Sequence, residues 1–160
     1  MTEELQIRPA TTADVNDVLA LIRELAEYEK LLHEVVATEE LVHEALFGAR
    51  PVAECVLACR SGTPVGFALY YHNYSTFLGR PGLYLEDLFV RPEHRGLGIG
   101  EALLRHLAGL AVQRGCTRME WAVLDWNKRA IEFYERMGAV GVSDWTIFRL
   151  SGAALVRLGS

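Results

Sequence analysis

Arg95-Gly96-Leu97-Gly98-Ile99-Gly100 is the stretch of this sequence that decides its fold. It lies between an apolar run, 83–90, and a helical pattern that starts at Ile99. Glycines at alternate positions allow a tight turn and leave the main-chain N–H groups uncovered, so that a helix N-terminus here forms a nest for phosphate oxygens. Arg95 adds a positive charge. A plain glycine turn that caps a helix explains the same residues, so both interpretations stay open at this point.

Two better-known phosphate motifs do not fit this stretch. A Gly-Lys-Ser/Thr sequence at P-loop spacing is missing, which excludes the Walker A motif. The glycines are spaced G-x-G-x-G rather than G-x-G-x-x-G, and no early βαβ unit surrounds them, which excludes the dinucleotide fingerprint.

Working outward from the glycines, hydrophobic periodicity predicts an α/β (α+β) chain with one domain over residues 1–160. Strands are predicted at 6–8, 53–59, 65–71, 83–90, 119–124 and 145–150. Helices are predicted at 15–29, 38–48, 99–111 and 127–137. Thr11 and Asp14 predict the N-cap of the first helix, and Glu29 falls on its apolar face.

The strand before the glycines carries two adjacent acids, Glu86 and Asp87. Neighbouring side chains of a regular strand point to opposite faces, so one acid is expected to face a cleft while the other finds a partner elsewhere. A carboxylate in a cleft could remove the proton of an alkylammonium, which is protonated near neutral pH. An ordinary strand-edge ion pair is the alternative.

The helix predicted at 127–137 places Asn127 and Tyr134 on one face, two turns apart. A phenol there could protonate a departing thiolate. A tyrosine that packs in the core with its hydroxyl turned outward is the alternative.

Composition narrows the class of protein. The 160 residues carry a formal net charge of −5, which argues against a nucleic-acid surface and suits a cationic substrate. Cys55, Cys59 and Cys116 lie in apolar segments without a second Cys/His pair at metal spacing, so we expect free thiols and no metal site. No apolar run is long enough for a membrane span and no secretion signal is evident, which predicts a cytoplasmic protein.

Together these segments resemble the GNAT superfamily of N-acetyltransferases: a strand, R-G-x-G-x-G, a helix, a further strand and N-x-x-A-x-x-F-Y-x-x-x-G. The last pattern is met by Asn127, Ala130, Phe133, Tyr134 and Gly138. Over nearly the whole chain the sequence is similar to the diamine (spermidine/spermine) and thialysine N-acetyltransferases. The resemblance implies the GNAT fold, a mixed and mostly antiparallel sheet of six to seven strands flanked by about four helices and splayed between its two central strands. It also implies a homodimer.

The resemblance implies a role for each matched residue. Acetyl-CoA, the co-substrate, would be held by Leu88, Phe89, Val90, Arg95, Gly96, Leu97, Gly98, Ile99, Gly100, Glu101, Asn127, Lys128, Arg129, Ala130 and Tyr134. Tyr134 would be the general acid toward the CoA sulfur, and Glu86, through water, the base. Tyr28, Glu29 and Glu86 would line the site for a small amine, with direct acetyl transfer between the two substrates.

Polyamine acetyltransferases that the chain resembles carry more acids before the catalytic strand. Here residues 72–77 contain none, and 139–144 contain only Asp144. A long polycation would need several carboxylates, because each exposed ion pair contributes only about 1 kcal/mol or less. A shorter amine is therefore favoured, such as thialysine, lysine or ornithine. The alternatives are a peptide or protein acetyltransferase, a non-catalytic CoA-binding module and a nucleotide-binding protein.

Overall fold

The computed structural model describes residues 4–160. Their contacts divide the chain into two compact units, residues 1–122 and 123–160, and each unit is described by itself. The prediction of a single domain stays a prediction.

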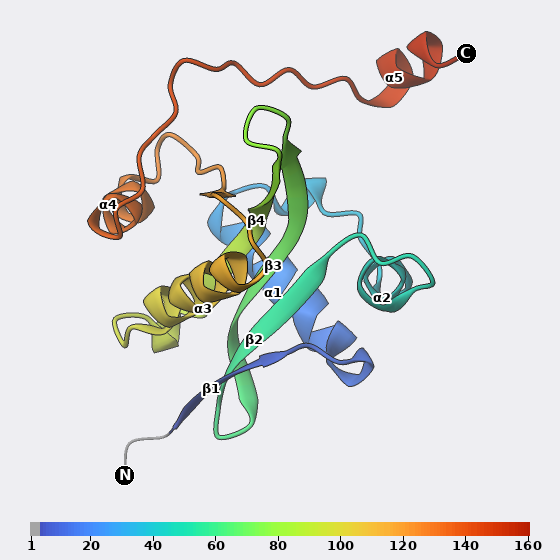
Figure 1. The fold of residues 1–160 in the computed structure, drawn as a ribbon. Helices are drawn as coiled ribbons and strands as arrows, with labels where there is room; N and C mark the ends of the chain where they lie inside the picture. Colours follow the sequence, from blue (N-terminus) through green and yellow to red (C-terminus); the bar gives the residue numbers. More distant parts are fainter. Residues whose placement is uncertain (1–3) are drawn as a thin grey trace. The chain divides into compact units, whose positions relative to one another are not determined.

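The first unit is built on one five-stranded sheet in the order β1-β2-β3-β4-β5 (Figure 1). The strands are β1 (Leu5–Pro9), β2 (Glu54–Arg60), β3 (Thr63–Ser75), β4 (Arg80–Val90) and β5 (Met119–Glu120). Neighbours pair antiparallel except β4 and β5, which pair parallel. The mixed, mostly antiparallel sheet is confirmed, with five strands rather than six to seven. β3 and β4 are longer than the strands predicted at 65–71 and 83–90, because residues 72–75 pair with residues 80–83 in a hairpin.

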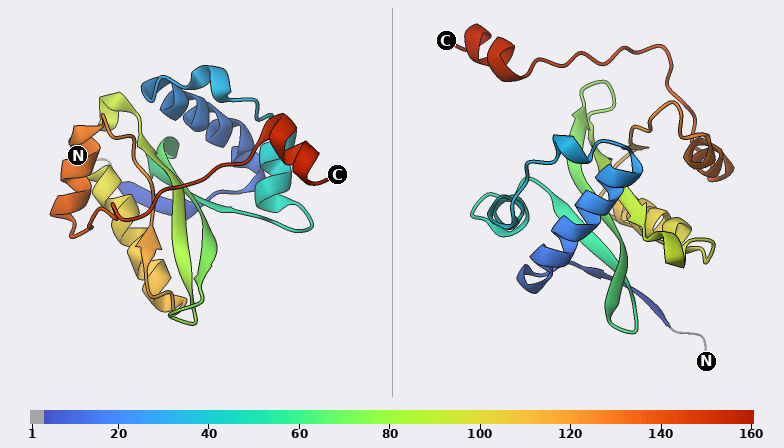
Figure 2. Two further views of the ribbon diagram at one scale, coloured as in Figure 1. Left: turned by 90° about the horizontal axis from the view of Figure 1, so that it is seen from above. Right: turned by 180° about the vertical axis from the view of Figure 1, so that it is seen from behind.

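Helices cover both faces of this sheet. They are α1 (Val15–Tyr28), α2 (Glu39–Phe47) and α3 (Ile99–Gln113), with short 3-10 turns at Thr12–Asp14, Leu32–Glu34 and Pro92–His94. α1 and α2 lie on one face and α3 on the other (Figures 1 and 2). The α1 face encloses a core with Val18, Leu21, Leu57, Phe67 and Phe89. None of the helices in the described residues is long and apolar enough to cross a membrane.

The 3-10 turn at Thr12–Asp14, which leads directly into α1, is capped by Asp14, and Asp14 is buried. One of its oxygens accepts a hydrogen bond from the Thr11 main-chain N–H at 2.7 Å, as a capping box requires. Both oxygens accept from the Arg8 guanidinium, at 2.7 and 2.9 Å. The hydrogen bonds from Arg8 hold the pKa of Asp14 well below its usual range. β1 and α1 are thereby joined through one carboxylate.

β5 is the edge strand of the sheet and pairs with β4 over a short distance, whereas the splay predicted between the two central strands stays a prediction. The two strands pair only at Leu83 with Met119 and at Tyr84 with Glu120. The strand predicted at 119–124 therefore ends at residue 120. From Leu85 onward, no strand within residues 4–160 pairs with this edge of β4.

The second unit contains α4 (Lys128–Arg136) and α5 (Gly152–Leu158). The Asn127 side chain caps α4 by accepting from the Ala130 main-chain N–H at 3.3 Å, so the predicted helix start is confirmed. The strand predicted at 145–150 is wrong, since no strand of the described residues pairs with it. Its apolar side chains are open to solvent, with Phe148 93% exposed. α5 was not predicted.

Candidate active site

A β-bulge in β4 brings the two adjacent acids to the same face of the sheet. Tyr70 pairs with Leu85 and Leu69 with Asp87, so Glu86 is the extra residue between them. Asp87 therefore shares a face with Leu69. The Tyr71 hydroxyl, two residues away on that face, donates to Glu86 at 3.3 Å. The expectation of opposite faces assumed a regular strand, and the bulge overturns it.

The α1 side of the sheet thus holds a cluster of three carboxylates: Glu29, Glu86 and Asp87. Burial, together with the charges of Glu86 and Glu29, raises the pKa of Asp87 to about 7. Burial also raises the pKa of Glu29. Glu86 is exposed. Neighbouring carboxylates that repel one another are stabilised by an incoming cation, so this cluster is suited to bind an ammonium group.

The unpaired edge of β4 offers main-chain groups beside these acids. The Arg91 N–H donates to the Val65 carbonyl at 2.8 Å, and bonded pairs alternate along an antiparallel ladder. Phe89 is therefore bonded to β3, whereas the N–H and C=O groups of Leu88 and the N–H group of Val90 face the open edge. The Val90 carbonyl, on the same edge, accepts from Arg95. An extended ligand could pair there as a strand does. Leu88, Phe89 and Val90 were all predicted to contact the cofactor. The register leaves main-chain groups of Leu88 and Val90 accessible for pairing, whereas Phe89 could contact a ligand only through its ring.

The glycine turn adjoins this edge at the start of α3. Gly96 and Gly98 have φ angles of 78° and 79°, which L side chains rarely adopt. A Cβ added at either glycine would meet no atom within 4 Å, so the backbone is open to a ligand there. The first N–H groups of α3 lack intrahelical acceptors and carry the positive end of its dipole. The open backbone of this turn is compatible with the predicted nest, and phosphate binding there stays a prediction.

Arg95 joins three of the predicted site segments. Its Nε donates to the Val90 carbonyl at 2.9 Å. Its guanidinium lies 4.8 Å from the ring centre of Tyr28 and 5.3 Å from that of Phe89. The last turn of α1, the end of β4 and the glycine turn are therefore in contact through one side chain.

The remaining predicted residues belong to the second unit. Asn127 caps α4, while Lys128 and Arg129 are exposed in its first turn. Tyr134 lies on α4, and its ring is 5.5 Å from that of Phe133. Asp87 is the residue that the sequence analysis did not assign. The adjacent acids Glu86 and Asp87 were a signal in the sequence, but the sequence did not indicate the bulge that decides which face of the sheet each side chain is on.

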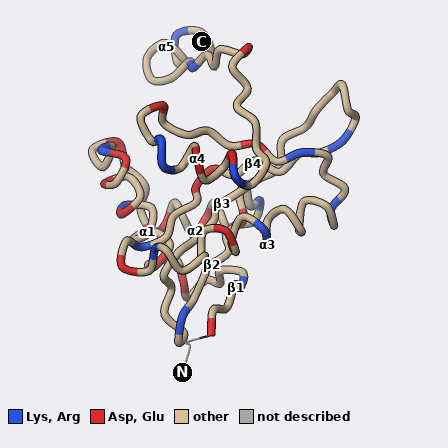
Figure 3. Tube along the Cα trace, turned by 90° about the vertical axis from the view of Figure 1, so that its left-hand side faces the viewer, with Lys and Arg blue, Asp and Glu red and all other residues tan. Residues whose placement is uncertain are grey.

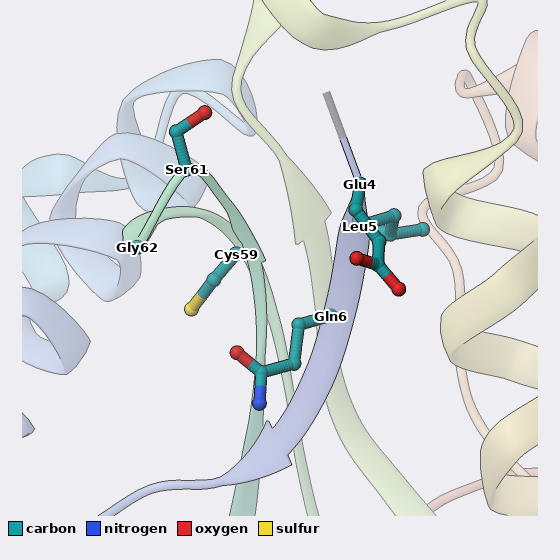
Figure 4. A pocket seen from close by; sticks show the side chains of 6 residues that line it. All are labelled: Glu4, Leu5, Gln6, Cys59, Ser61 and Gly62. Atoms are coloured by element: carbon teal, nitrogen blue, oxygen red, sulfur yellow. The ribbon is translucent and has the colours of Figure 1, made fainter. Parts of the chain in front are cut away.

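A separate hollow of about 520 Å³ lies beside the start of β1 and the turn that joins β2 to β3 (Figure 4). It is lined by Glu4, Leu5, Gln6, Cys59, Ser61 and Gly62. None of these residues belongs to the site described above, so the hollow takes no part in it.

Comparison with known proteins finds similar sequences and a similar fold. Residues 19–139 match the Acetyltransferase (GNAT) family. The chain is 42% identical to the thialysine N-epsilon-acetyltransferase of Bos taurus, with 96% of each chain covered. It is 33% identical to the L-ornithine N5-acetyltransferase of Arabidopsis thaliana, over 94% of this chain and 86% of that protein. Among solved structures, an integron cassette protein from V. cholerae is similar with a TM-score of 0.82, 26% identity and 97% of each chain covered.

Proposed function

Since the chain belongs to the acetyltransferase (GNAT) family, we propose that it transfers the acetyl group of acetyl-CoA directly to a primary amine of a small cationic substrate. The observation that carries this proposal is the carboxylate cluster of Glu29, Glu86 and Asp87 beside the open edge of β4. The named relatives act on thialysine and ornithine, which supports a basic amino acid as substrate. A cytoplasmic homodimer, as the resemblance implies, is part of the proposal.

The cofactor site has two parts in the first unit. The amides of Arg95, Gly96, Leu97, Gly98, Ile99, Gly100 and Glu101 would hold the pyrophosphate at the N-terminus of α3. The open-edge groups of Leu88 and Val90 would pair with the pantetheine arm, and Phe89 would flank it with its ring. Asn127, Lys128, Arg129 and Ala130 would contribute further contacts from the start of α4.

The amine site lies on the α1 side of the sheet. Glu29 and Asp87 would bind the ammonium charge, and the Tyr28 ring would form a wall. Acidic and basic residues are interspersed along the chain, as Figure 3 shows, so the charge of this site comes from local placement rather than from one long acidic run. The formal charge of −5 favours the approach of cations in general.

Acetyl-CoA supplies an acetyl group activated as a thioester. Glu86, through water, removes a proton from the substrate ammonium, and the amine nitrogen then bonds to the acetyl carbon. The Leu88 N–H donates to the acetyl oxygen as negative charge develops on it. The nitrogen releases its second proton to water as the carbon–sulfur bond breaks, and the Tyr134 hydroxyl gives its proton to the sulfur. Glu86 then loses its proton to solvent and Tyr134 takes one up, which restores both groups. Proximity of the two substrates supplies much of the rate enhancement.

The proposal is tested by following thiol release from acetyl-CoA with a panel of amines: thialysine, lysine, ornithine, putrescine, spermidine, spermine and a lysine-bearing peptide. Rapid release with one or more small amines supports the proposed function. Release with the peptide alone contradicts it and points to a protein substrate. Acetyl-CoA binding without release from any amine contradicts it in favour of a regulatory module.

A further inference from the structure

Beyond the carboxylate cluster, a row of polar and aromatic residues continues across the same face of the sheet. Tyr71 and Tyr84 are opposite each other on β3 and β4, and their rings stack with centres 5.2 Å apart. One step further, Tyr84 pairs with Glu120 on β5. Partners in adjacent strands lie on one face, so Glu120 and Glu86 are on the same side with Tyr84 between them.

Glu120 belongs to a small hydrogen-bond network with Arg118 and Asn73, which holds the Glu120 carboxylate and the Arg118 guanidinium in place. Its Oε1 accepts from the Nε of Arg118 at 3.1 Å and from the Nδ2 of Asn73 at 3.3 Å. The Asn73 side chain occupies the space above Gly82, where a Cβ would collide with its Oδ1. The absence of a side chain at Gly82 therefore leaves the space that the Asn73 side chain needs to reach Glu120.

The Arg118 and Glu120 side chains remain accessible, at 45% and 40% exposure. The bond to Glu120 uses Nε of Arg118, and the guanidinium carries two further NH₂ groups. The second carboxylate oxygen of Glu120 is a further acceptor. One accessible cation and one accessible anion, side by side, are complementary to the carboxylate and ammonium of an α-amino acid.

The spacing suits such a molecule. Glu86 and Glu120 are separated by two residues along a strand and one step between strands, which amounts to about 8 Å between their backbones. The distal nitrogen and α-carbon of an extended lysine are about 6 Å apart. Side chains that lean toward one another can therefore contact both ends of the substrate.

We propose that Arg118 and Glu120 bind the α-carboxylate and α-ammonium of a basic amino acid whose distal amine is acetylated at Glu86. This inference rests on the proposed function and deepens it by choosing amino acids over diamines. Arg118 binds the α-carboxylate, which a diamine lacks, and Glu120 binds the α-ammonium. Tyr71 and Tyr84 form the floor beneath the methylene chain.

The test compares three amines of equal length: lysine, cadaverine, which lacks the carboxylate, and 6-aminohexanoate, which lacks the α-amine. Arg118→Gln is expected to lower kcat/KM for lysine and 6-aminohexanoate by about 10- to 100-fold and not to lower it for cadaverine. Glu120→Gln is expected to lower kcat/KM for lysine and cadaverine and to spare 6-aminohexanoate. Arg23→Gln, which removes an exposed guanidinium from α1, is the matched control and should change none of them.

Two results overturn the inference while the proposed function stands. One is a wild-type enzyme that acetylates cadaverine better than lysine. The other is a pair of variants whose effects are equal for all three amines. Thermal unfolding of each variant shows that it is folded. If the wild type acetylates no amine in either panel, the proposed function itself fails.

Discussion

The guanidinium of Arg95 lies 4.8 Å from the ring centre of Tyr28, so a residue of the glycine turn contacts the last turn of α1. The cofactor side and the amine side of the proposed site therefore share one side chain. A planar guanidinium stacks on an aromatic ring, whereas an ammonium is a compact, strongly hydrated charge that does so less well.

We predict that Arg95→Lys raises KM for the amine as well as KM for acetyl-CoA, each about 3- to 10-fold. The retained charge still faces the phosphates, but Tyr28 loses the planar group that packs against it. Steady-state kinetics with each substrate varied in turn provide the measurement, and Arg105→Lys on the exposed side of α3 is the control. An increase confined to the KM of acetyl-CoA would show that the contact with Tyr28 does not position the amine site.

Gly98→Ala should weaken acetyl-CoA binding by at least 10-fold. Its φ of 79° strains any L residue by about 1 kcal/mol, and the added methyl group would fill the open space proposed for phosphate. Gly62→Ala is a matched control, because Gly62 has a φ of 78° and equally open surroundings in the β2–β3 turn. Calorimetric titration with CoA should separate the two variants, although their unfolding temperatures fall alike. Equal affinity in both would place the phosphates elsewhere.

Local signals in the sequence predicted the segments that are fixed by local bonds. Thr38 caps α2 and Asn127 caps α4, each through its own side chain and the amide three residues ahead. The glycine turn is also local, since it needs only positive φ angles before Ile99. Periodicity likewise found the helices that cover the sheet, because burial of one face imposes a 3.6-residue repeat.

The predictions that were wrong concern features that depend on pairing with residues distant in the sequence. Whether Glu86 is a bulge is decided by how β4 pairs with β3, and no neighbour of Glu86 signals it. Residues 145–150 have the apolar composition of a strand, yet a strand exists only when another strand supplies its hydrogen bonds. For the same reason β5 is limited to the two residues that pair with β4.

Tyr134→Phe should lower kcat by about 100-fold or more while KM for acetyl-CoA changes less than 3-fold. The phenol hydroxyl is proposed to act on the departing sulfur, and general acids contribute roughly 10²- to 10⁴-fold to rate. Pre-steady-state and steady-state thiol release give both constants. Phe133→Leu, which alters the neighbouring residue on α4, tests whether loss of an aromatic ring from this helix is enough to lower kcat. If Tyr134→Phe turns over like the wild type at every pH, Tyr134 is not the acid.

Asp14→Asn should destabilise the protein by about 2–4 kcal/mol at pH 7, because Asp14 is 7% exposed and serves both Arg8 and the cap of the 3-10 turn that leads into α1. The pKa of Asp14 is depressed in the folded protein, so its contribution is present above the unfolded pKa of about 4 and is lost as the pH falls. Urea unfolding at pH 7 and pH 3 measures this. Arg105→Gln, which breaks an exposed pair with Glu101, should cost about 0.5 kcal/mol or less. A difference that persists unchanged at pH 3 would contradict the assignment.

Asp87→Asn should make the protein more stable than the wild type at pH 8 and should narrow or remove that advantage at pH 4. Burial raises the pKa of Asp87 to about 7 in the folded protein, above the unfolded value of about 4. Between these values the folded state binds more protons than the unfolded state, so the wild type loses stability as the pH rises from about 4 to 7. The uncharged Asn removes this dependence. Urea midpoints of both proteins at pH 4, 6 and 8 give the measurement, with Asp17→Asn in the first turn of α1 as control. Parallel pH profiles for wild type and Asp87→Asn would show that folding does not raise the pKa of Asp87, which would contradict the prediction.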